Sequence, residues 1–407
     1  MSRGKLKIAV ISSGHIPSQW AHSMHTMKMA NAFSKLGYNV EVLTVERYLE
    51  RKNKQKIEDI YKFYGISENV KILYFRDNFL FYLEEMKPFN RILWILKKIT
   101  KNKIRYISDP EKQISECCKN NNVNLCYCRS YRTVFYNIKN KITSIMESHT
   151  PNIKHPDLQK VIKLSHSKYF RGLVTISDIL KHNFIKAGVP KDKILVLQDG
   201  VDIENFQSSL TKEEIREILK IPKDKKIVVY CGSLFPDKGI EHILLVAKNI
   251  PDVIFLLVGG RNQEIKMWKE YTITHKIKNV QFTGFVENSK VPLYLKAADV
   301  LIMPYKTDQK IKIMDIDTTS PLKLFEYMAA RRPIISTNIP AISRIITNGK
   351  DGLLAEPNNI QELSQFVKMV LKDNQLANKL ANNAYKKVQK YDWKERCKKI
   401  LNYFGIL

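Results

Sequence analysis

The sequence has no long apolar run, few cysteines and a shortage of acidic residues, and each absence narrows the possible classes of protein. No apolar stretch reaches the ~18 residues that a helix needs to span a bilayer. Six cysteines in 407 residues, without zinc-like spacing, exclude a disulfide scaffold and favour reduced thiols. The first apolar run, residues 8–13, is too short for a signal peptide and predicts a strand. We therefore expect a cytoplasmic protein.

The shortage of acidic residues leaves a large positive charge. There are 68 lysines and arginines against 40 aspartates and glutamates, so the net charge is +28 with histidine neutral. A surplus of this size indicates an anionic partner, which could be nucleic acid, an anionic membrane surface or a phosphorylated small molecule. An AT-rich genome, which favours lysine and asparagine codons, would give the same bias without any partner.

Short apolar runs alternate with helical patterns along the chain. Such alternation is typical of parallel sheets wrapped by helices, and the pattern starts afresh near residues 200–208. The sequence therefore predicts an α/β protein with two doubly wound halves, whose strand ends border a ligand cleft. Strands are expected at residues 7–12, 38–45, 70–75, 123–128, 142–147, 172–177 and 194–197, then at 226–231, 253–258, 280–283, 300–303 and 333–337. Helices are expected at 24–36 and 239–248, with two or three more between residues 362 and 401.

The strongest local motif is TTSPLKLFEYMAA at residues 318–330. Ser320 followed by Pro321 is typical of a helix start, with the hydroxyl as N-cap and proline at the first helical position. The free amides of residues 322 and 323 would then form an anion site suited to a diphosphate. Glu326, one turn later, could accept two hydroxyls of a ribose. An ordinary capped helix with a solvated glutamate is the alternative.

Two weaker signals lie at the ends of predicted strands. The loop GSLFPDKG at residues 232–239 has a glycine at each end, and its Lys238 stands at a helix start, where it could neutralise phosphate. This loop is neither a Walker A loop nor a Gly-x-Gly-x-x-Gly dinucleotide motif. His149 follows the strand expected at 142–147, a position common for catalytic groups, although a lone histidine is more often structural.

Together these segments resemble one family in order and spacing, the family-4-type retaining glycosyltransferases of the GT-B fold. The resemblance runs over nearly the whole chain and is carried by ITSIMESH, VTISDILKHNFIKAGVP, DGVDIENF, GSLFPDKGIEHIL, LLVGG, VQFTGFV, AADVLIMPY, SPLKLFEYMAARRPIIST and NGKDGLL. It implies two Rossmann-like domains facing across a cleft: an acceptor-side domain at 1–204 and a nucleotide-sugar-binding domain at 205–388. A last helix at 389–407, containing Trp393, would cross back to the first domain.

The resemblance also implies the reaction and its residues. A sugar would pass from a nucleotide-sugar donor to a hydroxyl of a glycan or lipid-linked acceptor with retained configuration, in surface polysaccharide or glycolipid synthesis. Lys238 and the amides of residues 322 and 323 would bind the diphosphate, Glu326 the ribose, and His149 would face the donor sugar. The further substrate-binding positions would be Gly14, Ser233, Arg261, Phe285, Val286, Asp317, Thr319, Ser320, Pro321, Leu322 and Lys323.

The chain departs from the family pattern at two of these places. Ser233 stands where the family often has arginine, so Lys238 and Lys323 would supply more of the positive charge. Thr318 stands eight residues before Glu326, where a first glutamate is usual, and the adjacent Asp317 could replace it. Residues 315–317 spell Asp-Ile-Asp, a pattern that can hold a divalent metal. We expect neither a metal nor another cofactor here, because amides and lysines can neutralise the diphosphate.

One basic segment of the sequence is consistent with binding to a membrane surface. Residues 87–105, KPFNRILWILKKITKNKIR, carry seven basic residues and no acid among apolar side chains, which is typical of an interfacial amphipathic helix. An ordinary domain helix with a basic face is the alternative. If this segment binds a membrane, we expect a peripheral protein on the inner face of the plasma membrane. A nucleic-acid-binding protein is a rival without a recognised motif, and an epimerase or hydrolase of the same fold is another.

Overall fold

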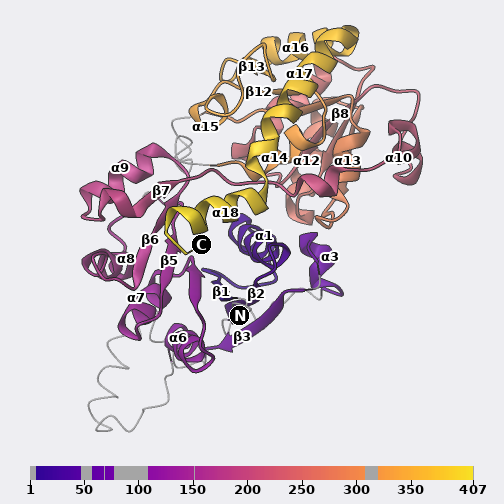
Figure 1. Ribbon diagram of the computed structural model, residues 1–407. Helices are drawn as coiled ribbons and strands as arrows, with labels where there is room; N and C mark the ends of the chain where they lie inside the picture. The colour runs from indigo at the N-terminus through magenta and orange to yellow at the C-terminus, as the bar shows by residue number, and fades with distance from the viewer. Residues whose placement is uncertain are drawn as a thin grey trace, which may run out of the picture. The chain divides into compact units, whose positions relative to one another are not determined.

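The computed structural model describes residues 6–46, 57–67, 69–77, 109–150, 152–307 and 320–406 (Figure 1). The chain forms two compact units, each described by itself below. Unit 1 comprises Met1–Gln198 and Arg396–Leu407, and unit 2 comprises Asp199–Glu395. No helix of the described ranges combines the length and apolar character that crossing a membrane requires.

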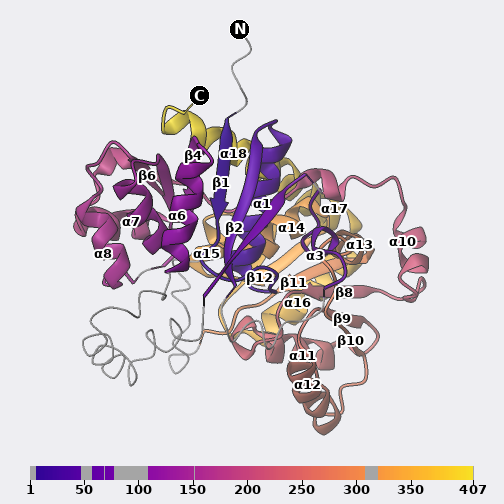
Figure 2. The ribbon, with the colours of Figure 1, turned by 90° about the horizontal axis from the view of Figure 1, so that it is seen from below.

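Unit 1 is built on a seven-stranded parallel sheet in the order β3-β2-β1-β4-β5-β6-β7. Strands β1 and β2 lie side by side in Figure 2. The strand order reverses between β1 and β4, and ligands bind beyond the carboxyl ends of strands at such a switch point. The strands are β1 (Lys7–Ile11), β2 (Asn39–Glu46), β3 (Lys71–Arg76), β4 (Leu125–Cys128), β5 (Ser144–Glu147), β6 (Phe170–Thr175) and β7 (Ile194–Val196). The helices are α1 (Ala21–Lys35), α3 (Ile60–Tyr64), α6 (Pro110–Asn120), α7 (Tyr131–Lys139), α8 (Pro156–Lys163), α9 (Asp178–Lys186) and η1 (Lys191–Lys193).

Unit 2 repeats this architecture with a six-stranded parallel sheet in the order β10-β9-β8-β11-β12-β13. Its strands are β8 (Ile227–Cys231), β9 (Ile254–Val258), β10 (Val280–Gly284), β11 (Val300–Met303), β12 (Ile334–Thr337) and β13 (Leu353–Ala355). Its helices are η2 (Ile203–Phe206), α10 (Lys212–Ile218), η3 (Pro236–Lys238), α11 (Ile240–Asn249), α12 (Asn262–Thr274), α13 (Val291–Ala297), α14 (Leu322–Ala329), α15 (Pro340–Ser343), α16 (Ile360–Lys372), α17 (Asn374–Val388) and η5 (Gln389–Tyr391).

Strand β8 shows how the sheet of unit 2 separates two cores. Val229 belongs to one buried cluster with residues of α13 and α14, whereas its neighbours Val228 and Tyr230 belong to another with residues of α11 and α16. Successive side chains of a strand point to opposite faces, so a strand that is apolar at every position needs helices on both faces. The predicted α/β class with two doubly wound, Rossmann-like parallel sheets is confirmed.

The last helix, α18 (Trp393–Tyr403), carries the chain from unit 2 to unit 1. Its later part lies beside α1 (Figure 1), and Cys397 Sγ is 3.9 Å from the carbonyl oxygen of Met29. Beyond the helix, Arg171 Nε donates to the carbonyl of Phe404 at 3.1 Å. The C-terminal segment is therefore an integral part of unit 1.

The division between the units falls at 198/199 and 395/396, whereas the sequence predicted 204/205 and 388/389. The reason is a short bridge between the two connecting segments. Val201 donates its N–H to the carbonyl of Tyr391 at 3.0 Å, and Trp393 donates to the carbonyl of Val201 at 3.3 Å. A Cβ on Gly200 would come within 3.0 Å of the Trp393 ring, so glycine permits the close packing. These contacts hold residues 199–204 and 389–395 together in unit 2.

Candidate functional site

The carboxyl end of β5 in unit 1 presents an acidic side chain without access to water. Glu147 is 1% exposed. Its Oε1 accepts from His149 Nε2 at 2.6 Å and from an Arg396 terminal nitrogen at 2.6 Å, and His25 Nε2 lies 3.0 Å from it. Its Oε2 accepts the hydroxyl of Tyr127. The carboxylate is thus surrounded by donors.

The charge of Glu147 depends on these partners. Burial by itself raises the pKa of a carboxyl, but the charge of Arg396 and the neighbouring imidazoles of His25 and His149 outweigh burial and hold the pKa of Glu147 well below its usual value. A buried charge is tolerated when it is paired and hydrogen-bonded in this way. Glu147 is therefore ionised and holds the side chains of His149 and Arg396 by hydrogen bonds.

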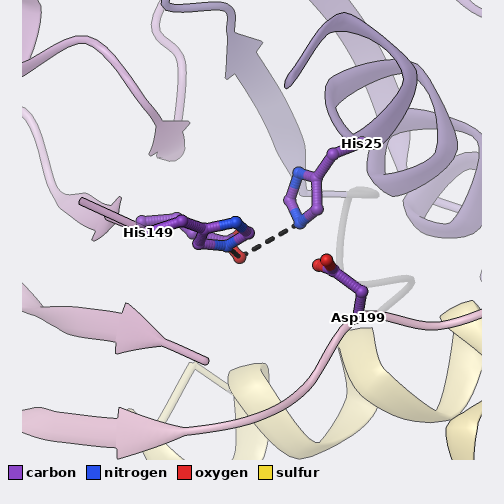
Figure 3. A group of neighbouring side chains, drawn as sticks. His25, His149 and Asp199 are labelled. Carbon is purple, nitrogen blue, oxygen red and sulfur yellow. Dashed lines mark hydrogen bonds and ion pairs between the residues drawn. The ribbon is translucent and has the colours of Figure 1, made fainter. Parts of the chain in front are cut away.

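His149 is the member of this group that reaches solvent. Its side chain is 17% exposed, whereas that of His25 is 2% exposed. The two imidazoles point toward one another, with ring centres 5.1 Å apart and an interplanar angle of 87° (Figure 3). A carboxylate only accepts hydrogen bonds, so His149 carries a proton on Nε2, and its neutral form offers Nδ1 as an acceptor.

The same group offers ligand atoms that a metal could use. Those of His25, Glu147 and His149 lie within 4.8 Å of one another. Arg396 already occupies the Oε1 atom that the histidines share, and its fixed positive charge opposes a cation at that place. The arrangement therefore fits an ion-pair network better than a metal centre. Asp199, also drawn in Figure 3, begins unit 2, where its N–H donates to Ser320 Oγ at 3.0 Å.

The predicted acceptor-side residue Gly14 lies in the loop after β1. Its carbonyl accepts from Thr44 Oγ1 at 3.0 Å, and a Cβ at this position would overlap the ring of His22. Burial, followed by the charges of Arg129 and His15, lowers the pKa of His22 to about 4. His22 is therefore a neutral imidazole near neutral pH, tightly packed against the loop.

In unit 2, the loop after β8 and the start of α14 come together. Gly232 has a φ of +145°, and a Cβ there would come within 2.9 Å of Lys323 Nζ. At the other end of the loop, Gly239 has a φ of +72° and lies so close to the carbonyl oxygen of Pro304 that no side chain fits. Gly232 thus permits the close approach of Lys323, and Gly239 permits the close approach of the Pro304 backbone.

Two ammonium groups meet beside this loop. Lys323 Nζ donates to the hydroxyl of Tyr230 at 2.8 Å and lies 4.5 Å from the centre of the Tyr230 ring. Lys238 and Lys323 both lie over the Tyr305 ring, at 5.7 and 5.9 Å from its centre. Burial, followed by the charge of Lys238, lowers the pKa of Lys323 to about 7. Lys238 pairs with Asp237 at 2.7 Å.

The start of α14 differs from the prediction. The helix begins at Leu322, with Pro321 as the N-cap residue and without a side-chain cap. Ser320 does not cap it, because its Oγ accepts the N–H of Asp199 instead. The prediction of Ser320 as N-cap is therefore wrong. The amides of Leu322 and Lys323 still belong to the first turn, where the helix provides no acceptor for them.

The remaining predicted residues of unit 2 surround this loop at different elements. Glu326 Oε1 accepts from Asn288 Nδ2 at 3.3 Å. Arg261 is the N-cap residue that precedes α12; it pairs with Glu264 at 2.5 Å and lies 4.9 Å from the centre of the Phe235 ring in the loop. After β10, Phe285 is 41% exposed and Val286 packs against the core. The carbonyl of Ser233 accepts a hydrogen bond from the Tyr230 hydroxyl at 2.7 Å. Four places named in the sequence lie outside the described residues: Asp317, Thr318, Thr319 and the segment 87–105.

Sequence reasoning missed three members of the unit 1 group: His25, Tyr127 and Arg396. His25 lies inside α1, Tyr127 in the apolar strand β4, and Arg396 in a lysine-rich tail. The place of His149 just after an expected strand pointed to this group, but the chain around the other three gives no comparable signal.

Comparison with known proteins identifies the larger part of unit 2. Residues 211–387 match the family model of the glycosyl transferases group 1. This part of the chain is similar to the group 1 glycosyl transferases. The kinship with GT-B glycosyltransferases that the sequence predicted is confirmed.

Curated glycosyltransferases and solved glycosyltransferase structures are also similar to this chain. An uncharacterized glycosyltransferase of Methanocaldococcus jannaschii is 25% identical over 248 residues, which are 58% of this chain and 60% of that protein. The chain spans about half to three-fifths of the length of the first curated relatives it matches. Anabaena HepE in complex with UDP-glucose has a TM-score of 0.68 at 16% identity and covers 99% of this chain and 100% of its own. WaaG, a glycosyltransferase involved in lipopolysaccharide biosynthesis, has a TM-score of 0.64 at 14% identity over 98% of this chain and 99% of its own. These likenesses establish the fold.

Proposed function

We propose that the protein transfers a sugar from a nucleotide-sugar donor to a hydroxyl acceptor. The observation that carries the proposal is the meeting of Lys238 and Lys323 beside the loop 232–239, next to the first turn of α14. Two ammonium groups and the outward amides of a helix start form a site for a compact, doubly charged anion. The diphosphate of a nucleotide sugar has this charge and size. Anabaena HepE, which shares the fold, was crystallised with UDP-glucose.

The same groups suit the chemistry of transfer. Cleavage of the bond between sugar and diphosphate develops negative charge on the leaving phosphate, and preorganised cations stabilise such charge. In our proposal the leaving phosphate accepts the proton of the acceptor hydroxyl on the same face of the sugar, which gives retention without a protein nucleophile. Glu326 holds the ribose hydroxyls, and the segments 259–261 and 284–286 flank the base.

His149 has the role of holding the donor sugar in this proposal. Its Nε2 is committed to Glu147, which leaves Nδ1 to accept a sugar hydroxyl. We expect His149→Ala to lower kcat by roughly 10- to 100-fold with little change in affinity for UDP, because the diphosphate groups lie in unit 2. Full transfer activity in this variant would remove His149 from the role.

The biological setting that we propose is the synthesis of a surface polysaccharide or glycolipid at the cytoplasmic face of the plasma membrane. WaaG, with the same fold, is involved in lipopolysaccharide biosynthesis, and residues 87–105 supply seven basic residues for an anionic surface. Co-sedimentation with anionic vesicles at low salt, lost at high salt, supports peripheral binding. The absence of binding at low salt contradicts it.

The decisive experiment is a thermal-shift screen against UDP, GDP, ADP, CDP and their sugar conjugates, followed by product analysis. A true donor stabilises the fold in proportion to the logarithm of its concentration. The donor is then incubated with and without simple glycoside acceptors. Glycoside formed only with an acceptor supports a transferase. Free sugar or an isomerised donor formed without an acceptor indicates the hydrolase or the epimerase instead.

A further inference from the structure

Among the described partners of Glu147, Arg396 comes from the far end of the chain. It is 4% exposed, although it is a charged residue of the C-terminal helix α18. Its Nε donates to the carbonyl of Gln198 at 2.9 Å, and one terminal nitrogen lies 3.1 Å from the Tyr127 hydroxyl. The other terminal nitrogen donates to Glu147 Oε1 at 2.6 Å. The planar guanidinium thus satisfies three acceptors in fixed directions, which an ammonium group cannot do.

Arg396 and His149 share one atom of Glu147. Both donate to Oε1, at 2.6 Å each, so the arginine acts on the very oxygen that orients the histidine. The other groups of unit 1 that face this carboxylate are His25 from α1 and the Tyr127 hydroxyl from β4. Of these partners, only arginine keeps its charge at every working pH. The ionisation of Glu147 therefore depends most directly on Arg396.

We propose that Arg396 is a positioning residue for the transfer reaction, acting through Glu147 to hold His149 with Nε2 protonated and Nδ1 free to accept a sugar hydroxyl. The role of Nδ1 as acceptor of a sugar hydroxyl rests on the proposed function. The tautomer of His149 follows from its hydrogen bond to Glu147 and does not depend on that function. The helix that returns to unit 1 thereby contributes to the chemistry of the site as well as to its stability.

The loss of Arg396 has a definite chemical consequence. Burial favours the neutral carboxylic acid, so Glu147 without its arginine takes up a proton at a much higher pH. The protonated carboxyl can donate to His149 Nε2, which moves the imidazole proton to Nδ1 and removes the acceptor. Activity then falls as the pH is lowered through the raised pKa of Glu147, so the acid limb of this variant lies at higher pH than that of the wild-type protein.

The test compares four variants of the full chain. Arg396→Met removes the charge, Arg396→Lys keeps it, and Glu147→Gln leaves a neutral side chain of the same shape. Arg171→Met is the matched control, because Arg171 holds the same C-terminal segment through Phe404 without touching Glu147. Each variant is measured for kcat across pH 5.5–8.5, for affinity toward UDP, and for the tautomer of His149 by nitrogen-15 NMR of labelled histidine.

The proposal expects Arg396→Met and Glu147→Gln to lower kcat by roughly tenfold or more with nearly unchanged affinity for UDP. Arg396→Met should shift the acid limb of the pH profile to higher pH and move the His149 proton to Nδ1. Arg396→Lys should restore the wild-type pH profile, and Arg171→Met should retain both profile and tautomer. If Arg396→Met keeps the wild-type tautomer and profile, or if Arg171→Met reproduces its effects, the proposal is overturned.

Two outcomes are kept apart by this design. If the wild-type protein shows no transfer with any donor, the proposed function fails, but the NMR measurement still decides whether Arg396 sets the tautomer. If Arg396→Met does not fold, Arg396→Lys and Glu147→Gln carry the test. In that case, wild-type tautomer and kcat in Glu147→Gln would overturn the proposal.

Discussion

Lys323 combines a positive charge with surroundings that disfavour it. Its side chain lies between the Tyr230 ring and the backbone of Gly232, with Lys238 as a second cation nearby. The carboxylates of Asp237 and Glu326 and the thiol of Cys231 act in the opposite direction, but burial prevails and the pKa falls to about 7. The phenols of Tyr230 and Tyr305 also face Lys323. A bound diphosphate would favour the protonated form.

This environment predicts a pH-dependent affinity for the donor. Above pH 7 the free site is mostly neutral at Lys323, and only the protonated fraction is competent, so the affinity for UDP-glucose should fall by about tenfold between pH 6 and pH 8. UDP-glucose is the suitable ligand because its diphosphate does not titrate in this range. Isothermal titration calorimetry at several pH values gives the slope.

The matched variants are Lys323→Arg and Lys238→Arg. Arginine stays charged throughout, so Lys323→Arg should flatten the slope, whereas Lys238→Arg should keep it. An unchanged slope in Lys323→Arg would assign the titration to another group.

At the scale of elements, the sequence predicted most of the two sheets because each strand is a short apolar run between polar or glycine-rich turns. β11 was predicted with its observed bounds, since Val300–Met303 lies between Asp299 and Pro304. β13 (Leu353–Ala355) was not among the predicted strands. The start of α14 was misplaced because Ser320 has a partner, Asp199, that is distant in sequence. The Glu147 network escaped prediction for the same reason, since Arg396 lies 249 residues away.

The junction between η3 and α11 gives a prediction at this scale. Gly239→Ala places a Cβ against the Pro304 carbonyl at a backbone conformation that alanine disfavours. We expect the free energy of unfolding, measured by urea denaturation, to fall by about 1–3 kcal/mol. Affinity for UDP-glucose should fall as well, because Lys238 directly precedes the altered residue.

Gly349→Ala is the control for backbone conformation alone. Its φ of +73° matches that of Gly239, but nothing lies within 4 Å of the added Cβ. Its effect on unfolding should be clearly smaller, and its affinity for the ligand should be unchanged. Equal destabilisation in both variants would show that the contact with Pro304 does not contribute to the free energy of unfolding.

At the scale of the whole molecule, the two units carry different kinds of charge. Unit 2 gathers cations and helix amides around one loop, whereas unit 1 buries an anion that holds two imidazoles. In the proposed function, the cations of unit 2 bind the charged part of the donor. The net charge of +28 is far larger than either cluster requires.

The cationic loop of unit 2 predicts transfer without a divalent metal. In the proposed function, Lys238, protonated Lys323 and the first amides of α14 would neutralise the leaving diphosphate, the task that Mg²⁺ performs in other phosphate sites. We expect the initial rate of transfer to be unchanged by EDTA in excess. Lys238→Met should lower kcat by roughly 10²-fold, and added Mg²⁺ or Mn²⁺ should not restore it. A rate abolished by EDTA and recovered with a divalent ion would assign the neutralisation to a metal instead of the lysines.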